Sequence, residues 1–517
     1  MSTTRAIPEE PTPRRTIAVA GVMLVIFLFA IDATIVSTSM PTIVARLGGL
    51  ELYGWVFSIY MLTSALSTPV FGKLADLFSR RRLMLAGIAV FVVGSTLCGM
   101  AWSMKALVVF RAIQGLGGGA IYALSFIIAG VLYPPDRRAR VQGVISGIWG
   151  VSSVLGPLAG GLIVEHASWR WVFFVNLPIA ALSVALIATG LREAEAEHRV
   201  PKLDLAGTAA LLAALMLMFY ALSHGAHNRR PLNPEVLSLL GLSAVFLTAF
   251  YLIERRAEEP VIPLDLFPIP LYRVSSAVAA LAAMGVFGAI SYLPLYLQGV
   301  TGLAASRAGA VLLVLSLGWT VGSLIADPVI RRGGYRFAAA AGMASMALGY
   351  SVFVFAASAG GVPAVVAGGC LIGVGMGMAN LTSLVAAQSA VPMRRIGVAT
   401  STIMLFRTFG GAFCISLMGT VLLDRMQHGL QMLDGASDLP GSLRGRIADP
   451  QYLLEPAARA TIPASLLPKL TSLLADALWY AFLVGLLLMI AGLAASLCMQ
   501  SRAPHGPTGR DSGRAIV

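Results

Sequence analysis

The sequence is poor in charged residues. Of its 517 residues, only 12% are Asp, Glu, Lys or Arg, while 57% are hydrophobic. An average soluble protein carries about 25% charged and about 45–50% apolar residues. A chain of this length would need several soluble domains, and it has too little charge to cover their surfaces. The composition therefore excludes a soluble enzyme, a disordered scaffold and a disulfide-built secreted module, and it predicts a polytopic membrane protein.

Cysteine and histidine are also scarce. The four cysteines lie apart inside apolar runs without any C-x-x-C pair, so the sequence predicts buried free thiols rather than disulfides or a zinc site. The six histidines fall in predicted loops or in the tail. The sequence also lacks a G-x-x-x-x-G-K-[ST] phosphate loop, a G-x-S-x-G turn and paired carboxylates within its apolar runs. We therefore expect no metal, no other cofactor and no enzymatic activity.

Long apolar runs are abundant. A helix needs about 20 apolar residues to cross the hydrocarbon core of a bilayer, and the sequence contains fourteen candidate runs. The first run is too long for a signal peptide, so we predict that it is an uncleaved span. The runs lie near residues 16–40, 54–75, 83–103, 104–130, 141–164, 171–191, 205–223, 236–253, 274–299, 308–327, 337–357, 363–390, 398–423 and 474–499.

The basic residues indicate how these spans are oriented. If the N-terminus is cytoplasmic, most of the 37 Lys and Arg residues fall in segments on that side. This bias follows the positive-inside rule. We therefore predict a multi-pass protein of the plasma membrane, expected to be a bacterial cytoplasmic membrane, with both termini in the cytoplasm. The net charge of +13 then reflects orientation, and no nucleic-acid partner is expected.

Three charged residues lie deep within predicted spans: Asp32, Arg111 and Arg407. Each needs an explanation, because a charge near the bilayer centre costs at least roughly 2.5–3.5 kcal/mol on insertion scales. A rise of about 1.5 Å per residue places Asp32 and Arg111 at similar depths, where direct or water-mediated contact is feasible. We predict that Asp32 carries protons, with a static buried ion pair as the alternative. Arg407 could counter a helix dipole, bind water or stabilise one conformation.

The segment after the second span reads GKLADLFSRRR from Gly72. It resembles the cytoplasmic loop signature of the major facilitator superfamily, G-x-L-a-D-r-x-G-r-r, with Ser79 in place of the second Gly. The resemblance implies close helix contact at Gly72 and an Asp76 that faces the positive N-terminal end of a neighbouring helix. It also implies that Arg80 and Arg81 latch two halves of the protein together on the cytoplasmic side. A plain positive-inside loop is the alternative.

Three further signatures lie on spans in the first half of the chain. The fourth span reads RAIQG from Arg111, which resembles the superfamily's R-x-x-q-G signature, whose Arg is associated with proton handling. The first span ends DATIVSTSMP from Asp32, which is similar to a signature of the fourteen-span drug:proton antiporter family (EmrB/QacA-like). The fifth span resembles the antiporter signature g-x8-G-x3-G-P-x2-G-G, with Ser152 replacing one Gly; the matching residues are Gly143, Gly156, Pro157, Gly160 and Gly161.

The resemblance covers nearly the whole chain and implies a major facilitator fold. Stretches at 169–178 and 292–298 are also similar to the fourteen-span family. Its architecture is two six-helix halves plus two extra central helices, which gives fourteen transmembrane helices. The segments expected on this scheme are an N-tail at 1–15, an N-terminal half at 16–192, a linker with two additional helices at 193–257, a C-terminal half at 258–499 that includes a long extracytoplasmic loop at 424–473, and a C-tail at 500–517.

The same resemblance assigns expected roles to individual residues. Asp32 and Arg111 are expected to couple protons to transport. The residues expected to gate the conformational change are Gly72, Asp76, Arg80, Arg81, Gly156, Pro157, Gly160 and Gly161. The candidates for lining a substrate cavity are polar or aromatic residues within spans, a class that more often serves packing: Gln114, Trp149, Tyr292, Tyr296, Gln298, Trp319, Asn380 and Arg407.

These expectations converge on a proton-coupled secondary active exporter that works by alternating access. The resemblance implies amphipathic drugs or toxic compounds as substrates, and a lone deep carboxylate is compatible with lipophilic monovalent cations. The alternatives are a dedicated exporter of one endogenous metabolite, siderophore, antibiotic or lipid, and a non-transporting receptor. The expected partners are a small-molecule substrate, protons and the lipid bilayer, with a periplasmic adaptor if the cell has an outer membrane.

Overall fold

The computed structural model describes residues 13–48, 52–133, 135–191, 204–227, 234–257, 260, 262, 264–303, 305–359, 361–432 and 466–501. Every regular element in these ranges is helical, and eleven of the helices are long and apolar enough to cross a membrane. The prediction of an all-α polytopic membrane protein is therefore confirmed. Most of the predicted tails at 1–15 and 500–517, and most of the loop at 424–473, lie outside the described residues.

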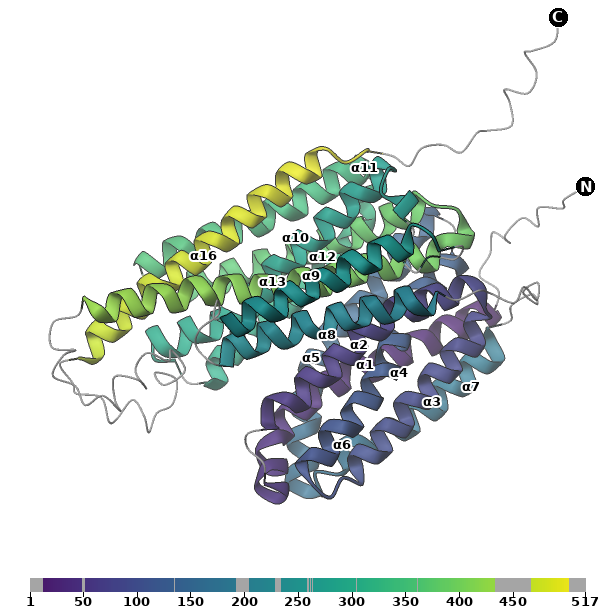
Figure 1. The fold of residues 1–517 in the computed structure, drawn as a ribbon, viewed down its shortest axis with the longest axis horizontal. Coiled ribbons are helices and arrows are strands. Elements are labelled where there is room, and N and C mark those ends of the chain that lie inside the picture. Colours follow the sequence, from purple (N-terminus) through teal and green to yellow (C-terminus); the bar gives the residue numbers. More distant parts are fainter. Residues whose placement is uncertain are drawn as a thin grey trace, which may run out of the picture.

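The first group of helices, called the N-half from here on, runs from α1 to α7 and is drawn in purple to blue in Figure 1. Its long helices follow the apolar runs, and serine side chains begin two of them. Ser79 caps α3 and Ser103 caps α4, each by accepting a hydrogen bond from a backbone N–H in the first turn. The bounds are α1 Pro13–Leu47, α2 Tyr53–Leu77, α3 Arg80–Gly99, α4 Met104–Leu132, α5 Pro135–His166, α6 Trp171–Phe174 and α7 Asn176–Gly190.

The last group of helices, called the C-half, runs from α10 to α16. A π-helical turn, η3, extends the C-terminal end of α10 just after Pro294, where the proline removes a backbone donor from the helix. The bounds are η2 Leu264–Leu266, α10 Pro270–Leu295, η3 Tyr296–Val300, α11 Ala305–Ala359, α12 Val362–Ser389, η4 Met393–Arg395, α13 Ile396–Gln431 and α16 Leu467–Leu497.

The element α11 consists of two helices that meet at Gly334. This glycine has φ 75° and ψ 178°, a left-handed conformation that a residue with a side chain rarely adopts, and it reverses the chain. The part before Gly334 runs parallel to α12, and the part after it runs antiparallel. α11 therefore accounts for the runs predicted at 308–327 and 337–357. The close contacts with α12 that show both directions are Gly318–Cys370, Gly322–Val374, Gly342–Ala379 and Gly349–Ile372.

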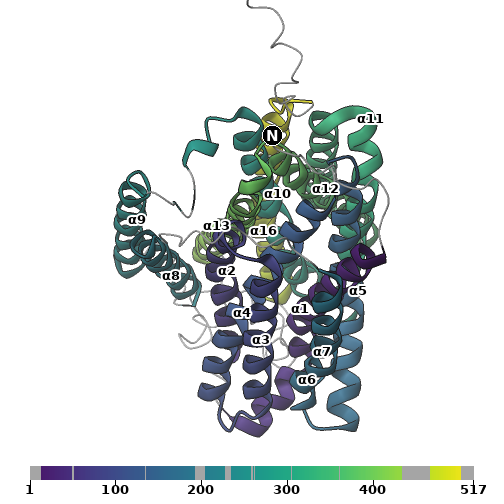
Figure 2. The same ribbon diagram turned by 90° about the vertical axis from the view of Figure 1, so that its right-hand side faces the viewer.

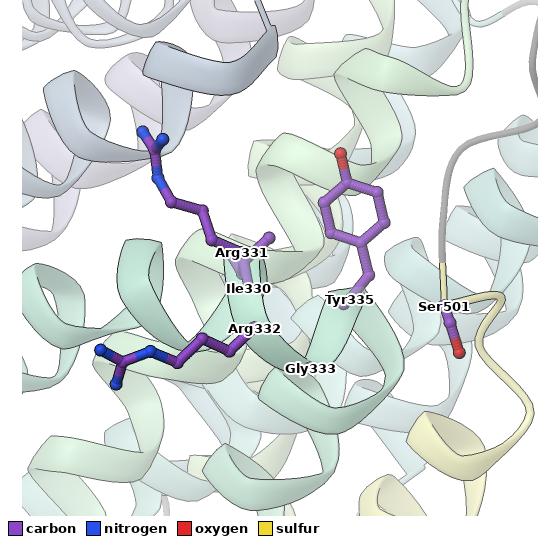
Figure 3. Close-up of a pocket in the computed structure, with 7 residues that line it drawn as sticks. Ile330, Arg331, Arg332, Gly333, Tyr335 and Ser501 are labelled. Carbon is purple, nitrogen blue, oxygen red and sulfur yellow. The ribbon is translucent and has the colours of Figure 1, made fainter.

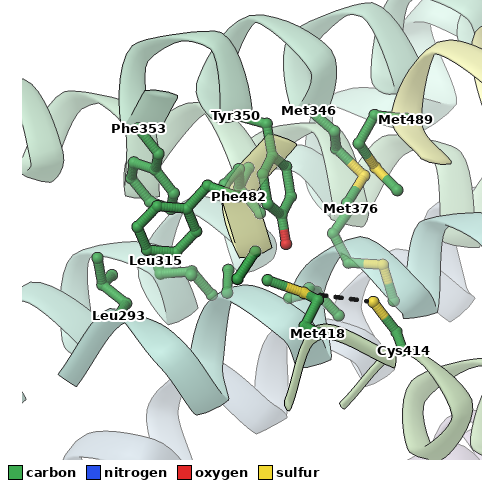
Figure 4. Packing of buried hydrophobic residues seen from close by; sticks show 14 of the residues in the cluster. Leu293, Leu315, Met346, Tyr350, Phe353, Met376, Cys414, Met418, Phe482 and Met489 are labelled. Carbon is green, nitrogen blue, oxygen red and sulfur yellow. Dashed lines mark hydrogen bonds between the residues drawn. The ribbon is translucent and has the colours of Figure 1, made fainter. Parts of the chain in front are cut away.

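Methionine and aromatic side chains form the core of the C-half (Figure 4). Met418 lies with its sulfur 3.5 Å from the Cys414 sulfur, and both face Gly288 of α10. The Tyr350 hydroxyl donates to the Gly285 carbonyl oxygen at 2.6 Å. Methionine adapts to irregular spaces, and the glycines let the helices approach closely. This core makes the C-half a packed unit of its own.

Two helices stand outside both halves. α8 (Leu205–His227) and α9 (Pro234–Glu254) form a pair that lies to one side of the molecule in Figure 2. The Ser243 hydroxyl of α9 donates to the Ala214 carbonyl oxygen of α8 at 2.8 Å. Leu211 and Leu215 of α8 share a buried apolar cluster with Leu66 of α2 and Leu405 of α13. The pair therefore touches one helix from each half.

The two halves contact each other at one end of the molecule. We call it the basic end, because Arg80, Arg138, Arg331 and Arg395 all lie in the helix termini and turns there. Hydrogen bonds between the halves, described below, join α2 to α13 and α5 to α12 at this end. Figure 1 shows the helices of the two halves diverging toward the opposite end.

Candidate functional site

The Asp32 carboxylate lies at the centre of a buried polar cluster in the N-half. Its side chain is 0% exposed, and that of Arg111 is 1% exposed. Arg111 Nη1 donates to Asp32 Oδ2 at 2.7 Å, and Gln114 Nε2 donates to Asp32 Oδ1 at 2.9 Å. Arg111 and Gln114 reach the same carboxylate because a spacing of three residues places them on one face of α4. Of the direct or water-mediated contact that the sequence made feasible between Asp32 and Arg111, the structure shows the direct one.

A third donor comes from the start of α7. Asn176 Nδ2 donates to Asp32 Oδ1 at 2.9 Å, and it also lies 2.9 Å from Ser95 Oγ of α3. Ser95 in turn donates to the Phe173 carbonyl oxygen at 2.9 Å, in the short helix α6. Four helices and α6 therefore meet around this carboxylate. The cluster fixes the position of Asp32 from several directions.

The Arg111 guanidinium makes several contacts besides the ion pair. Its Nη1 also donates to Gln114 Oε1 at 2.9 Å, and its Nε donates to the Val56 carbonyl oxygen at 3.4 Å. The guanidinium carbon lies 3.9 Å from the centre of the Tyr60 ring, a cation–π contact. Both Val56 and Tyr60 belong to α2. Arg111 therefore joins α1, α2 and α4 through one planar group.

The sequence hypothesis identified only part of this cluster. Gln114 was expected to line the substrate cavity, whereas the structure places its amide on Asp32. Asn176, Ser95 and Tyr60 received no role. Asn176 carried a usable signal, because it is an amide within an apolar run and within the stretch 169–178 that is similar to the fourteen-span family. Ser95 and Tyr60 carried none, since hydroxyl-bearing residues occur in most of the spans.

The antiporter-like segment of α5 packs directly against the part of α1 that carries Asp32. A Cβ atom added to Gly156 would overlap the Thr34 hydroxyl. Thr34 also donates to the Ser152 carbonyl oxygen of α5 at 3.1 Å. Gly160 is buried, but Gly161 faces open space. The segment thus brings Gly156, and not Gly161, against α1. The Pro157 side chain lies outside the described residues.

The Asp76 carboxylate joins the two halves at the basic end. Its Oδ1 accepts from the Gly397 N–H and its Oδ2 from the Val398 N–H, each at 2.8 Å. These are the first free donors of α13, so the negative carboxylate also lies at the positive end of the helix dipole. A Cβ atom on Gly72 would overlap the Ser401 side chain, which shows how closely α2 approaches α13.

The remaining residues of this loop lie at the start of α3. Arg80 and Arg81 occupy its first turn, directly after the Ser79 cap. Ser79 has φ −58° and ψ 117°, so the position does not require the glycine found in the superfamily signature. At this turn, the Ser79 side chain caps α3 at the position where the signature has glycine.

A second set of polar contacts joins the halves beside the first. Gln142 Nε2 of α5 donates to Gln388 Oε1 of α12 at 2.8 Å. Gln388 Nε2 donates to the Thr400 hydroxyl of α13 at 2.9 Å and lies 3.5 Å from the Phe126 carbonyl oxygen of α4. Gly143 packs against the Ser323 carbonyl oxygen of α11. The basic end is therefore closed by buried contacts from several helices of each half.

The aromatic candidates for a substrate cavity fall into two places. Trp149 is half-buried in the N-half, where its ring lies edge-on to Phe29 at 5.6 Å and to Tyr122 at 6.2 Å. Tyr292 donates its hydroxyl to the Ile415 carbonyl oxygen, and Tyr296 packs on Phe482 within the C-half core. Gln298 lies half-buried in η3.

Three other candidates share an unusual property. Trp319 Nε1, Asn380 Oδ1 and Arg407 Nε are buried and have no hydrogen-bond partner. Buried polar atoms are normally paired, because an unpaired one costs about 1–3 kcal/mol. These three residues lie on α11, α12 and α13, all within the C-half.

A surface hollow of about 360 Å³ lies at the turn of α11. Figure 3 shows Arg331 and Arg332 projecting beside it and Tyr335 and Ser501 on its other side. Arg331 is paired with Asp327, 3.0 Å away. The hollow lies at the basic end and is separate from the Asp32 cluster. Within the described residues, no group of three or more His, Cys, Asp or Glu side chains is arranged to hold a metal.

Comparison with known proteins places this geometry in context. A family model described as the Major Facilitator Superfamily matches residues 22–414. The chain is 32% identical over 510 residues to the Multidrug transporter protein MdtP of Bacillus subtilis, covering 95% of this chain and 94% of the relative. It is also 32% identical over 487 residues to Multidrug resistance protein 3 of the same species, covering 93% of this chain and 94% of that relative. With the Efflux pump dotC of Dothistroma septosporum, the identity is 31% over 447 residues, covering 84% of this chain and 76% of that relative.

Solved structures are similar in fold. The human organic anion transporter MFSD10 (TETRAN) has a TM-score of 0.61 at 17% identity, with 92% of this chain and 100% of that chain covered. A bacterial homologue of the human lysosomal transporter Spinster, in an inward-facing and unoccupied conformation, has a TM-score of 0.56 at 17% identity, with 94% of this chain and 97% of that chain covered. At this level of identity the likeness concerns the arrangement of helices.

Proposed function

Because this chain belongs to the major facilitator superfamily, we propose that it exports amphipathic small molecules in exchange for protons. Membership of the family makes it a multi-pass membrane transporter of small molecules and not an enzyme. Relatives named as multidrug transporters and efflux pumps support export as the direction. Amphipathic drugs or toxic compounds are then the proposed substrates.

The observation that carries proton coupling is the buried cluster around Asp32. Among the described residues, it holds the one acid that is fully buried in the middle of a long helix. Two neutral amides and one cation donate to the carboxylate. Protonation of Asp32 would remove the charge that Arg111 balances and change the energy of the whole cluster. Asp32 is therefore the proposed proton carrier, and Arg111 is its proposed partner.

The surrounding contacts support a way to transmit this change. Thr34 lies two residues from Asp32 and is in contact with α5 at Gly156. The helix α5 also carries Gln142, which bonds to the C-half at the basic end. A shift of α1 that follows protonation would thus act on a helix that joins the halves. Loss of the Asp76 and Gln142 contacts would let the basic end open, giving alternating access.

The topology follows from the same proposal. We assign the basic end to the cytoplasm, in keeping with the positive-inside rule. α5 and α8 join the eleven apolar helices as membrane spans, and the two parts of α11 count as two, which gives fourteen. The α8–α9 pair then corresponds to the two extra central helices.

Transport in everted membrane vesicles tests the function. With a pH gradient imposed, acid inside, vesicles containing the protein should accumulate lipophilic dyes above the level in control vesicles. Collapse of the gradient by nigericin should release the accumulated dye. Accumulation that requires ATP, or that persists after the gradient is collapsed, would contradict proton-driven export.

A further inference from the structure

We propose that Arg407 binds the anionic group of the exported molecule, so that the preferred substrates are amphipathic anions such as aromatic carboxylates. The inference rests on the proposed export function and names its substrate class. Arg407 is 6% exposed, and its Nε lacks any hydrogen-bond partner. No described acidic side chain forms an ion pair with it. A buried charge without compensation is strongly unfavourable, and a bound anion would supply the missing charge.

The deep charges of the described residues leave one positive charge uncompensated. Asp32, Arg111 and Arg407 are the buried charged residues that lie far from a helix end or turn. Asp32 and Arg111 compensate each other at 2.7 Å. Arg407 therefore sets the net charge of the membrane interior, which attracts anions and disfavours cations.

The Asp32 carboxylate is poorly placed to receive a cationic substrate. Both of its oxygens are already occupied, by Arg111 on Oδ2 and by Gln114 and Asn176 on Oδ1. A lipophilic cation would have to displace Arg111 and leave that guanidinium without a counter-charge. The structure therefore favours anions over the monovalent cations that a lone deep carboxylate had suggested.

Arg407 lies next to apolar side chains at the contact between the two halves. Arg407 follows Ile403 and Met404 on one face of α13, and both of those residues share a buried cluster with apolar side chains of the N-half. Arg407 lies about 16 Å along the axis from the start of α13. It is thus placed one turn beyond the region where the two halves pack together.

A second unpaired group lies at the same level. α12 and α13 are antiparallel neighbours, and Gln388 bonds to Thr400. Counting from that pair along both helices brings Asn380 level with Arg407. The Oδ1 atom of Asn380 is also buried without a partner. The Arg407 guanidinium and the Nδ2 group of Asn380 can donate to a carboxylate, whereas the unpaired Oδ1 atom can only accept a hydrogen bond.

Binding of three matched probes tests the inference without any proton gradient. The probes share one ring system and differ in charge: anthracene-9-carboxylate, anthracene-9-carboxamide and 9-(aminomethyl)anthracene. Their dissociation constants would be measured by fluorescence on the purified full-length protein at pH 7.5. We expect the carboxylate to bind about tenfold or more tightly than the amide, and the protonated amine to bind most weakly. Arg407→Gln should bring carboxylate affinity down to that of the amide.

Two variants keep the test interpretable. Arg407→Lys retains the charge and should keep part of the preference for the carboxylate, provided that it elutes as a folded monodisperse protein. Arg425→Gln is the matched control, because Arg425 lies farther along α13 and stacks on Tyr480; it should leave all three affinities unchanged.

Three results would overturn the inference. They are equal or tighter binding of the amide or amine, an Arg407→Gln protein with an unchanged ratio of carboxylate to amide affinity, and no binding of any probe. If the preference persists but vesicle uptake fails, only the proton-driven export is contradicted.

Discussion

At the scale of single residues, the Arg111 guanidinium joins three helices within the Asp32 cluster. One nitrogen contacts both Asp32 and Gln114, another contacts the Val56 carbonyl oxygen, and the planar face lies on Tyr60. A lysine ammonium carries the same charge but has neither the planar face nor the separated donors. Charge alone is therefore insufficient at this position.

We expect Arg111→Lys to impair both folding and transport. The variant keeps a cation near Asp32 but loses the cation–π contact and at least one hydrogen bond, which costs about 1–3 kcal/mol. Transport driven by a pH gradient should fall roughly tenfold, and the midpoint of thermal unfolding in detergent should decrease. Arg255→Lys is a suitable control, because exposed Arg255 lies 5.8 Å from the Tyr251 ring. An Arg111→Lys protein with normal transport would show that a point charge is enough.

Sequence reasoning worked at this scale for charges and failed for neutral polar groups. Asp32, Arg111 and Arg407 were found because a charge in an apolar run is conspicuous and needs an explanation. Ser95 was missed because a hydroxyl in a span is common, and Asn176 was missed although an amide in an apolar run is a usable signal; in both cases the three-dimensional neighbours show what the side chain does. The contact of Gln114, a candidate for the substrate cavity, with Asp32 could likewise not be predicted from its residue type.

At the scale of helices, the contact between α1 and α5 depends on the absence of a side chain at Gly156. The Thr34 side chain occupies the space that a Cβ atom would fill, and it bonds to the Ser152 carbonyl oxygen at the same crossing. Gly161 belongs to the same signature but has nothing within 4 Å. The two glycines therefore serve different purposes.

Gly156→Ala and Gly161→Ala form a matched pair that tests this distinction. The added methyl group at position 156 should push α1 away from α5, move Asp32 from its donors and reduce transport roughly tenfold, since overpacking typically costs about 1–3 kcal/mol. The same methyl group at position 161 should leave transport within about twofold of the unmodified protein. Initial rates in reconstituted vesicles at equal protein levels would compare them. Equal losses for the two variants would refute the assignment.

The helices themselves were predictable because each apolar run has the length of a membrane crossing. Their ends were less predictable. α13 extends over 36 residues, well past the run predicted at 398–423, because polar residues can continue a helix into water once the apolar part has formed it. Likewise, the runs at 308–327 and 337–357 predicted two helices in this region, but the residue at which the chain reverses, Gly334, is defined by its backbone conformation.

At the scale of the whole molecule, the halves are held together at the basic end by buried hydrogen bonds. Asp76 supplies two of them, to the first backbone donors of α13. The Gln142–Gln388 pair lies between α5 and α12. On the proposed mechanism of alternating access, these contacts break in each transport cycle. Their strength therefore sets how the two states are populated.

Removal of the Asp76 carboxylate should shift that population. Asp76→Ala loses two charge-assisted hydrogen bonds and a helix-dipole interaction, so the state with a closed basic end should lose stability by a factor of roughly ten or more. Electron–electron distances between spin labels at exposed positions 82 and 394 would report the change, in a background without the free cysteines. The distribution should gain a longer component. Asp424→Ala, at the far end of α13, should leave it unchanged.

The arrangement of the whole molecule could not be derived from residue patterns alone. Apolar runs reveal where helices lie, but not that α8 packs on Leu66 and Leu405 and so touches both halves. Likewise, Asp76 was expected to face a helix N-terminus, but the identity of that helix depends on contacts more than 300 residues apart in the sequence. Such contacts are set by packing of the folded halves.

The central claim is that Asp32 exchanges protons in step with substrate, and proton release from purified protein tests it most directly. In weakly buffered detergent solution near neutral pH, addition of a transported compound should release protons, detected by a pH-sensitive dye. Asp32→Asn, which preserves the shape of the side chain, should abolish the release while the protein still binds the compound. Undiminished proton release from a folded Asp32→Asn protein would contradict the account.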